Sequence, residues 1–577
     1  MKILLTAINA KYIHSSLSIR YLNSYSHDFS EHITMLEYTI NNAEDFILSD
    51  IFLNEPDVVC FSCYIWNINM VTSLARSLKK VLPNLHIICG GPEVSYECEK
   101  FLEENPSINT VIYGEGEKTF YDVISALINS GNFDNIKGIF YRTGNKINAS
   151  TPQPPLSLSE LPFVYNNLDA LQNKIIYYET QRGCPYDCQF CLSSIEKGVR
   201  FVPIENVYKQ LDFFLQNKVS QVKFIDRTFN CNKTHAEAIW KYLIENDNGI
   251  TNFHMEIEAH IMDNETLELL KTARDGLFQF EIGVQSTNEK TLFAVKRNSD
   301  FSSLKERILR IISLENIHVH LDLIAGLPYE NYSSFKNSFN DVYALNPHQL
   351  QMGFLKLLKG SGLKRDANKY LIKARESAPY EILSTDHLSY KDVLKLKGIE
   401  NMLETYRNSG KAVKTTDYMC SIFSTPVEFY ESLAEFWQEK GFHKVNHNKE
   451  SLYTILYEFS LEKRLNHIAV IKELLKFDML ACDNLSTMPV WIENTKNDEN
   501  IRLVRKTFFN NSSNLQRYLP KLSDYTPAQL GRMCRLEPFK QDILNEQSKK
   551  ETYILFNYYE RDFLYNHGKY TTVEVNT

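Results

Sequence analysis

The chain has 577 residues, of which 43% are hydrophobic and 23% are charged, and its formal net charge is −8. This length predicts about three to four compact units, and the composition is that of a folded protein rather than a disordered one. Proteins that bind nucleic acid non-specifically usually carry an excess of basic residues, whereas this chain has a net negative charge, so we expect no nucleic-acid partner.

The start of the chain, MKILLTAINAKYIH, becomes polar too early for a secretory signal. No segment approaches the roughly 18 apolar residues that a membrane-spanning helix needs. The eleven cysteines form no paired framework, which argues against disulfides. We therefore expect a cytoplasmic protein without a membrane partner, in which any special cysteines bind metal or react.

Residues 1–145 alternate short apolar runs with amphipathic helical runs. The strand-like runs are KILLTAIN, HITMLEYTI, DVVCFSCYIW, LHIICGG and TVIYGEGE. This alternation predicts an α/β domain with a Rossmann-like (flavodoxin-like) parallel sheet and helices on both faces. Ligands of such sheets bind at the loops that follow the strands.

Three further segments follow this domain. The Pro- and Ser-rich run TPQPPLSLSELP predicts a linker over residues 146–169. Residues 170–365 again alternate strand and helix, which predicts a partial TIM-type (β/α)6 barrel with its site at the carboxyl ends of the strands. Residues 366–577 predict a mainly helical C-terminal domain with a possible strand pair around YILFNYYE, and substrate recognition is a possible role for it.

The segment ETQRGCPYDCQFCLSS places Cys184, Cys188 and Cys191 at CxxxCxxC spacing, directly after the first predicted barrel strand. Three thiolates on one short loop can bind three irons of a 4Fe-4S cluster and leave the fourth iron open to a small molecule. A structural zinc site normally has four ligands, and a redox disulfide needs only two cysteines. The pattern therefore favours an iron-sulfur cluster over zinc.

The cysteine loop resembles that of the radical S-adenosylmethionine (SAM) superfamily, and the resemblance covers residues from about 172 to 365. It implies that the three cysteines ligate the cluster, that SAM chelates the open iron, and that reduction yields a 5'-deoxyadenosyl radical. The aromatic residue Phe190, just before the last cysteine, fits the same pattern and is a candidate cofactor contact.

The rest of the barrel is similar to the branch that includes oxygen-independent coproporphyrinogen oxidase and its cobalamin-binding relatives. The resemblance implies SAM contacts at Glu258 in MEIEAH, Gln285 in EIGVQS, Arg297 in AVKRN and Asp322 in LDLIAGLP. Each of these residues alone would equally suit a solvated charge or a turn. Their joint order and spacing favour a cofactor site.

Two segments depart from this branch. A glycine- and glutamate-rich segment after the second strand is replaced by FIDRTFN, which is similar to the version in cobalamin-dependent members and makes Asp226 a further candidate cofactor contact. The last barrel strand ends in LLKGSGL, so Lys359 lies where relatives often have the proline of Pro-Gly-Thr.

Residues 1–145 resemble the cobalamin-binding domain that precedes the barrel in one radical SAM subgroup. The matching features are ILLTAINAKYIHSSLSIRYL, VVCFSCYIWN and the GGPEVS and GEGE turns. The resemblance implies cobalamin contacts at Gly90, Gly91, Gly114 and Glu115, although the same turns would suit ordinary strand-to-helix connections. No DxHxxG motif is present, and we interpret His14 as an ordinary polar residue rather than a cobalt ligand.

The resemblance implies a radical SAM methyltransferase that uses a 4Fe-4S cluster, SAM and cobalamin to methylate an unactivated carbon. The expected partners are a small-molecule or peptide substrate and an electron donor such as flavodoxin or ferredoxin. The sequence assigns no catalytic side chain, and it does not identify the substrate.

Three alternatives remain at this stage. The chain could be a cobalamin-independent or non-methylating radical SAM enzyme that performs cyclisation or rearrangement, or a non-catalytic iron-sulfur protein. A tRNA methylthiotransferase would need a second cluster in the first domain. The cysteines there, Cys60, Cys63, Cys89 and Cys98, do not match three separate loop cysteines, and Cys60 and Cys89 lie in apolar strand runs that predict core packing.

Overall fold

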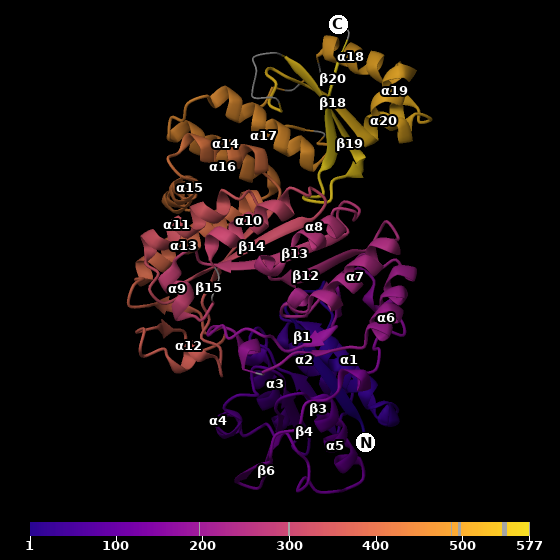
Figure 1. The fold of residues 1–577 in the computed structure, drawn as a ribbon, viewed down its shortest axis with the longest axis vertical. Coiled ribbons are helices and arrows are strands. Elements are labelled where there is room, and N and C mark those ends of the chain that lie inside the picture. Colours follow the sequence, from indigo (N-terminus) through magenta and orange to yellow (C-terminus); the bar gives the residue numbers. More distant parts are fainter. Residues whose placement is uncertain are drawn as a thin grey trace. The chain divides into compact units, whose positions relative to one another are not determined.

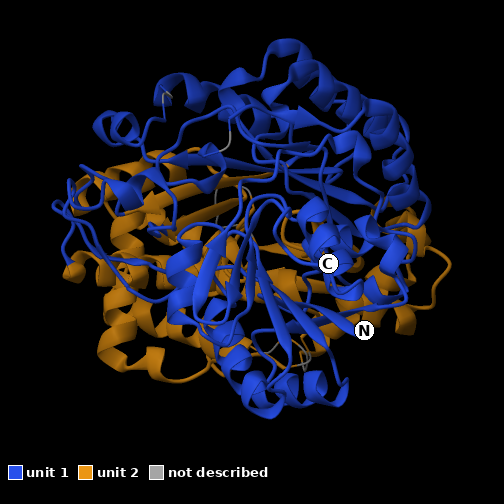
Figure 2. Ribbon diagram, turned by 90° about the horizontal axis from the view of Figure 1, so that it is seen from below, with its two compact units in different colours: residues 1–317, 326–331, 354–389 blue, residues 318–325, 332–353, 390–577 orange. Residues whose placement is uncertain are grey.

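The computed structural model describes residues 1–195, 197–297, 300–485, 487–493, 495, 498–544 and 551–575. The chain divides into two compact units, which Figure 2 shows in blue and orange. Unit 1 comprises Met1–Ile317, Gly326–Asn331 and Phe354–Ser389. Unit 2 comprises His318–Ala325, Tyr332–Gly353 and Tyr390–Thr577.

Unit 1 begins with a seven-stranded sheet in the order β2-β1-β3-β4-β5-β6-β7. Its strands are β1 (Ile3–Asn9), β2 (Ile33–Thr39), β3 (Val58–Ser62), β4 (His86–Gly90), β5 (Thr110–Ile112), β6 (Ile139–Thr143) and β7 (Lys146–Ala149). The first five strands pair in parallel, and β6 and β7 add an antiparallel edge. The sheet thus extends into the first four residues of the segment that the sequence predicts as a linker.

Helices cover both faces of this sheet. They are α1 (Leu17–Tyr25), α2 (Glu44–Leu53), α3 (Ile68–Val81), α4 (Cys98–Glu104) and α5 (Glu117–Ile128). Alternate residues of the central strands point to two separate cores: Leu4 and Val59 pack with α2, α3 and α4, whereas Leu5 and Cys60 pack with α1 and α5. The predicted Rossmann-like arrangement is confirmed (Figure 1).

The second part of unit 1 contains four parallel strands in the order β13-β12-β11-β8. They are β8 (Ile176–Tyr178), β11 (Gln221–Phe224), β12 (Asn252–Ile257) and β13 (Phe278–Gln285), and the short pair β9 (Gln181–Arg182) and β10 (Arg200–Phe201) accompanies them. The helices are α6 (Ile204–Gln216), α7 (Lys233–Glu245), α8 (Asn264–Leu270), α9 (Glu289–Ala294) and α10 (Phe301–Ile312). Alternating strands and helices produce the parallel sheet that the sequence predicts.

Unit 1 also includes a later segment with α12 (Gly362–Arg365), β16 (Lys373–Ala374) and β17 (Ile382–Ser384). Two contacts fix this segment within the unit. The backbone N–H of Leu363 donates to the carbonyl oxygen of Gln189 at 2.8 Å, and Lys359 Nζ lies 2.8 Å from Glu93 Oε1.

Unit 2 contains β14 (His318–Ala325), most of β15 (Gln349–Phe354) and a helical region, as predicted. Its helices are α11 (Tyr332–Tyr343), α13 (Tyr390–Leu403), α14 (Val413–Ile422), α15 (Pro426–Lys440), α16 (Lys449–Glu462), α17 (Ile468–Cys482), α18 (Glu499–Asn510), α19 (Ser512–Tyr518) and α20 (Pro527–Met533). The strands β18 (Cys534–Phe539), β19 (Thr552–Arg561) and β20 (Gly568–Val573) form an antiparallel sheet in that order. Within the described ranges, no helix has the length and apolarity to cross a membrane.

Candidate functional site

The loop that carries the three cysteines follows β9 in unit 1. Gly183 has φ +97°, and a Cβ at this position would lie 2.1 Å from the carbonyl oxygen of Gly198, so only glycine fits there. The thiol of Cys188 is buried, whereas Cys184 and Cys191 are partly exposed. The chain thus presents three thiols on one constrained loop.

Each thiol has a polar neighbour from outside the motif or from the turn after it. Cys184 Sγ lies 3.5 Å from Thr228 Oγ1, and the backbone N–H of Ser193 points at Cys191 Sγ at 3.4 Å. Arg297 Nη1 lies 4.0 Å from Cys188 Sγ. Phe190 is half-buried between the last two cysteines. Donors directed at sulfur stabilise thiolates, which are the form that binds iron.

Two of the predicted SAM contacts meet beside Cys188. Arg297 Nη2 lies 2.8 Å from Glu258 Oε2 and 2.5 Å from the carbonyl oxygen of Gly283. The other oxygen of Glu258 lies 2.8 Å from His260 Nδ1. Burial opposes ionisation of Glu258, but His260 and Arg297 together keep its pKa below the ordinary value. Glu258 therefore remains a carboxylate near neutral pH.

Gln285 ends β13 with φ +70°. Its side chain folds toward Gly283, where an added Cβ would lie 2.0 Å from Gln285 Nε2 and 3.8 Å from Arg297 Nη2. Among the described residues, Gln285 Oε1 and Arg297 Nε are buried without a hydrogen-bond partner. Buried polar atoms of this kind need an explanation, and a bound ligand supplies one.

Asp226, which follows β11, is fully buried. Its carboxylate accepts hydrogen bonds from the backbone N–H of Thr180 at 2.8 Å, from that of Gln181 at 3.1 Å and from the Thr180 hydroxyl. Burial raises its pKa to about 7 despite these donors. Asp226 thus joins β11 to the start of the cysteine loop, and its contact with SAM stays a prediction.

Asp322 lies on β14 in unit 2, with Oδ1 3.1 Å from His320 Nε2. A contact between Asp322 and SAM also stays a prediction. The other predicted cofactor contacts of the barrel all belong to unit 1: Phe190, Asp226, Glu258, Gln285 and Arg297.

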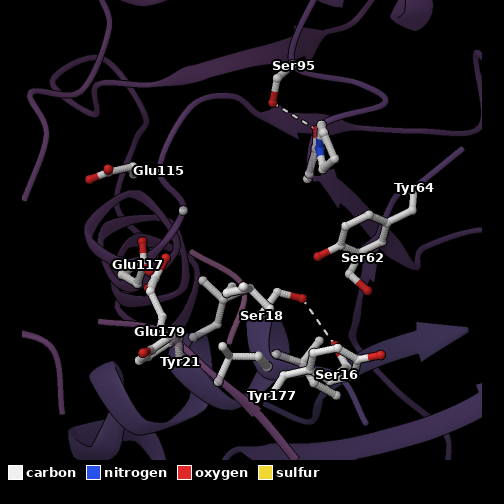
Figure 3. Close-up of a pocket in the computed structure, with 18 of the residues that line it drawn as sticks. Ser16, Ser18, Tyr21, Ser62, Tyr64, Ser95, Glu115, Glu117, Tyr177 and Glu179 are labelled. Atoms are coloured by element: carbon white, nitrogen blue, oxygen red, sulfur yellow. Dashed lines mark hydrogen bonds between the residues drawn. The ribbon is translucent and has the colours of Figure 1, made fainter. Parts of the chain in front are cut away.

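A pocket of about 790 Å³ opens where the parallel strands of the N-terminal sheet end (Figure 3). The predicted cobalamin-contact residues Gly90, Gly91, Gly114 and Glu115 all line it. Tyr64 and Trp66 also line the pocket and stack on one another, with ring centroids 4.4 Å apart.

Two polar residues of the pocket, Ser62 and His14, differ in their hydrogen bonding. Ser62 Oγ is buried and has no hydrogen-bond partner among the described residues. His14 Nδ1 lies 2.6 Å from the hydroxyl of Tyr177, and burial together with nearby lysines lowers the pKa of His14. His14 is thus hydrogen-bonded as an ordinary polar residue.

An ion-pair network joins the GEGE turn to the cysteine loop. Arg182 lies 2.5 Å from Glu117 Oε1 and 3.0 Å from Glu179 Oε2, with Glu115 also within 3.7 Å. Glu115 in addition pairs with Arg200 and accepts the backbone N–H of Leu156 at 2.9 Å. Sequence reasoning missed this network, because its partners are up to 85 residues apart.

A second unpredicted link involves Lys359, the residue that replaces an expected proline. Its ammonium group pairs with Glu93 of the GGPEVS turn, and Glu93 also accepts the Tyr380 hydroxyl. Gly360 packs against the ring of Tyr96, where a Cβ would lie 2.6 Å from the ring. The departure from the family pattern thus has a structural reason.

The first-domain cysteines do not resemble a second cluster site. Cys60, Cys63, Cys89 and Cys98 are all buried, and Cys60 and Cys89 belong to the sheet cores as predicted. This arrangement disfavours the methylthiotransferase alternative, which requires loop cysteines that are open to a cluster.

Three family models match the chain in succession. Residues 3–124 match the B12 binding domain, residues 178–342 match the Radical SAM superfamily, and residues 368–556 match a protein family of unknown function, DUF4080. The first model implies cobalamin, and the second implies a 4Fe-4S cluster and SAM.

Curated relatives resemble parts of the chain. A 2-(S-pantetheinyl)-carbapenam-3-carboxylate methyltransferase from Streptantibioticus cattleyicolor is 25% identical over 52% of this chain and 46% of its own length. An anaerobic magnesium-protoporphyrin IX monomethyl ester cyclase from Synechocystis sp. is 28% identical over 43% of this chain and 51% of its own length. The matches therefore span about half the length of these relatives.

Among solved structures, the cobalamin-dependent S-adenosylmethionine radical enzyme OxsB with aqua-cobalamin bound has a TM-score of 0.57 and 16% identity, covering 90% of this chain and 84% of that one. This likeness shows a shared fold. With the two domain matches, the chain carries a B12 binding domain followed by a Radical SAM domain, and the cysteine loop lies within the second.

Proposed function

We propose that this chain is a cobalamin-dependent radical SAM methyltransferase that acts on an unactivated carbon. The observation that carries the proposal is the 790 Å³ pocket in unit 1, which residues of the N-terminal sheet and of the cysteine loop line together; we call it the shared pocket. The turns of the B12-binding domain border it on one side, through Gly91 and Gly114, and the start and end of the cysteine loop border it on the other, through Gly183 and Ser193.

The residues present fit the cluster and SAM. Cys184, Cys188 and Cys191 offer three thiols with no fourth protein ligand in the motif, which suits a cluster with one open iron. The unpaired atoms Gln285 Oε1 and Arg297 Nε offer an acceptor and a donor beside Cys188. These are the complementary groups that the amino group and the carboxylate of SAM require.

The residues present also fit cobalamin. The glycine turns at Gly91, with φ +113°, and at Gly114, with φ +75°, bring backbone to the pocket surface without side chains. Ser62 Oγ provides a hydroxyl that lacks a partner among the described residues. A corrin bears amide arms that such hydroxyl and backbone groups can bind.

When bound, these cofactors supply reductive cleavage of SAM and a transferable methyl group. The protein contributes placement. The three thiols hold the cluster, while the Glu258–Arg297 pair, anchored at Gly283, keeps its charges oriented before SAM arrives. The burial of Cys188 and Glu258 limits the access of water to the reacting groups.

The magnesium-protoporphyrin cyclase relative favours one alternative, in which the same domains support a reaction other than methylation. The domain order alone does not distinguish the two, because fold does not determine chemistry. We further propose a flavodoxin or ferredoxin as the electron donor, in a cytoplasmic setting.

The test is anaerobic purification with iron and cobalamin, followed by reduction and assay of 5'-deoxyadenosine and S-adenosylhomocysteine. Formation of both products supports methyl transfer, whereas 5'-deoxyadenosine without S-adenosylhomocysteine would support the non-methylating alternative. The triple variant C184A/C188A/C191A should lose the cluster absorbance and both products.

Cys231 provides the matched control for the triple variant. It is partly exposed and lies near the loop, with Sγ 3.5 Å from Gln181 Oε1, but it lies outside the motif. The variant C231A should therefore retain a full complement of iron. Intact cluster absorbance in the triple variant would overturn the assignment of the three ligands.

A further inference from the structure

One arginine in the shared pocket differs from the other cations there. The pocket is lined by Arg182, Lys223 and Arg227. Arg182 is neutralised by Glu117 and Glu179, and Lys223 Nζ lies 3.1 Å from Glu281 Oε2. Among the described residues, Arg227 has no carboxylate within ion-pair distance, and its side chain is exposed to the pocket.

The loop that carries Arg227 is rigidly held. Its neighbours Asp226, Thr228, Phe229 and Asn230 are all buried, with at most 5% of their surface exposed. The Asn230 amide exchanges two hydrogen bonds of 2.9 Å with the backbone of Glu258, and Gln181 Nε2 donates to the carbonyl oxygen of Thr228 at 2.6 Å. Among residues 226–230, Arg227 alone is exposed.

The loop that carries Arg227 lies beside the cysteine loop. The loop follows β11 at the carboxyl end of the barrel strands, where such folds bind their substrates. Thr228, the next residue, lies 3.5 Å from the thiol of Cys184. Tyr64 lines the same pocket, and the charge of Arg227 partly opposes the rise that burial causes in the Tyr64 pKa.

We propose that Arg227 is an anion-binding residue that holds a carboxylate or phosphate group of the substrate between the B12-binding domain and the cluster loop. This inference rests on the proposed function. A guanidinium group binds planar carboxylates and phosphates through paired hydrogen bonds from its fixed fork of donors, and the backbone that carries Arg227 is already held in place. The substrate class is therefore an anionic small molecule or an anionic group on a larger one.

The same anion chemistry could come from the carboxylate of SAM or from the phosphate of cobalamin. Arg297, which lies 4.0 Å from Cys188 Sγ, is better placed for the SAM carboxylate. The experiment must separate these sources.

Anaerobic calorimetric titration of the protein, loaded with cluster and cobalamin, uses inorganic phosphate and acetate as probes at low ionic strength. At least one probe should bind the unsubstituted protein, and R227Q should weaken that binding at least tenfold. R227K should weaken it less, because the charge remains but the paired hydrogen bonds do not. The control R76Q removes an exposed arginine on α3, outside the pocket, and should bind the probe as the unsubstituted protein does.

Three results would overturn the proposal. The first is probe binding that is absent from the unsubstituted protein or unchanged in R227Q. The second is displacement of the probe by SAM, which would assign the site to the SAM carboxylate. The third is a tenfold loss of cobalamin affinity in R227Q, which would assign it to the phosphate of the cofactor.

These titrations require no turnover, so they separate this inference from the proposed function. If the probe binds as expected but no 5'-deoxyadenosine forms after reduction, the proposed function fails while the anion site remains. Melting temperatures of R227Q, R227K and R76Q within a few degrees of the unsubstituted protein exclude misfolding as the cause of any loss.

Discussion

Asp226 shows how one buried side chain makes stability depend on pH. Its folded pKa of about 7 lies above the value of about 3.9 that an aspartate has in an unfolded chain. The folded state therefore binds the proton more tightly, and the stability that this proton provides is complete below about pH 4. That stability decreases as pH rises toward 7, by at most about 1.4 kcal/mol per pH unit.

The substitution D226N should remove this dependence. An asparagine can keep its oxygen on the backbone N–H groups of Thr180 and Gln181, so the hydrogen bonds survive while the charge is lost. Thermal unfolding between pH 5 and pH 8 should show a smaller decline for D226N than for the unsubstituted protein. D45N, at an exposed position on α2, is the control. Equal declines in D226N and the unsubstituted protein would contradict this account.

The cysteine loop was predictable because its three thiols lie within eight residues and their spacing carries the chemistry. The surroundings of the loop were not predictable. Arg182 is adjacent to this motif in sequence, but its partner Glu117 lies 65 residues away in another domain. The hydrophobic periodicity of a sequence predicts which face of an element a residue occupies. It does not predict which charged residues from distant segments form ion pairs after folding.

At the scale of elements, the turns after β3 and β4 depend on one close backbone approach. Gly91 has φ +113°, and a Cβ there would lie 2.6 Å from the carbonyl oxygen of Cys63. Gly114 also has a positive φ, +75°, but a Cβ there would meet no atom within 4 Å. Substitution of Gly114 therefore tests the cost of the left-handed backbone alone, whereas substitution of Gly91 adds a steric collision to that cost.

We expect G114A to lower the free energy of unfolding by about 1–2 kcal/mol, the cost of a left-handed conformation for a residue with a Cβ. G91A should cost more, because the turn or the Cys63 backbone must also move. Denaturant unfolding of both variants measures the difference. A smaller loss in G91A than in G114A would mean that the turn adapts without strain.

The sequence predicted the parallel sheets because alternating strands and helices leave few arrangements. It predicted a strand pair near the C-terminus but did not identify β18 as a third strand. The reason is Glu537, a charged residue in the run CRLEPF that is only 1% exposed. Lys476, Arg505 and Arg535 surround its carboxylate at 3.1, 2.7 and 2.9 Å.

At the scale of the whole molecule, the pocket and the cluster cysteines belong to unit 1, whereas the Glu537 network belongs to unit 2. A ligand stabilises the part of the protein that binds it, by about 2.7 kcal/mol when present at 100 times its dissociation constant. Cobalamin should therefore slow hydrogen exchange in β1, β3 and β4, by up to about 100-fold, and leave α17 and β19 unchanged.

The variant E537Q provides the converse test. Removal of one partner from a buried ion pair typically costs about 3–5 kcal/mol, because the remaining charges stay buried without compensation. E537Q leaves the buried Lys476 and the partly buried Arg505 and Arg535 without their shared carboxylate, so exchange in α17, β18 and β19 should accelerate. Because every described residue that lines the pocket belongs to unit 1, cobalamin should still bind E537Q with unchanged affinity and still protect β1. A loss of cobalamin affinity in this variant would show that the stability of unit 2 controls the cofactor site.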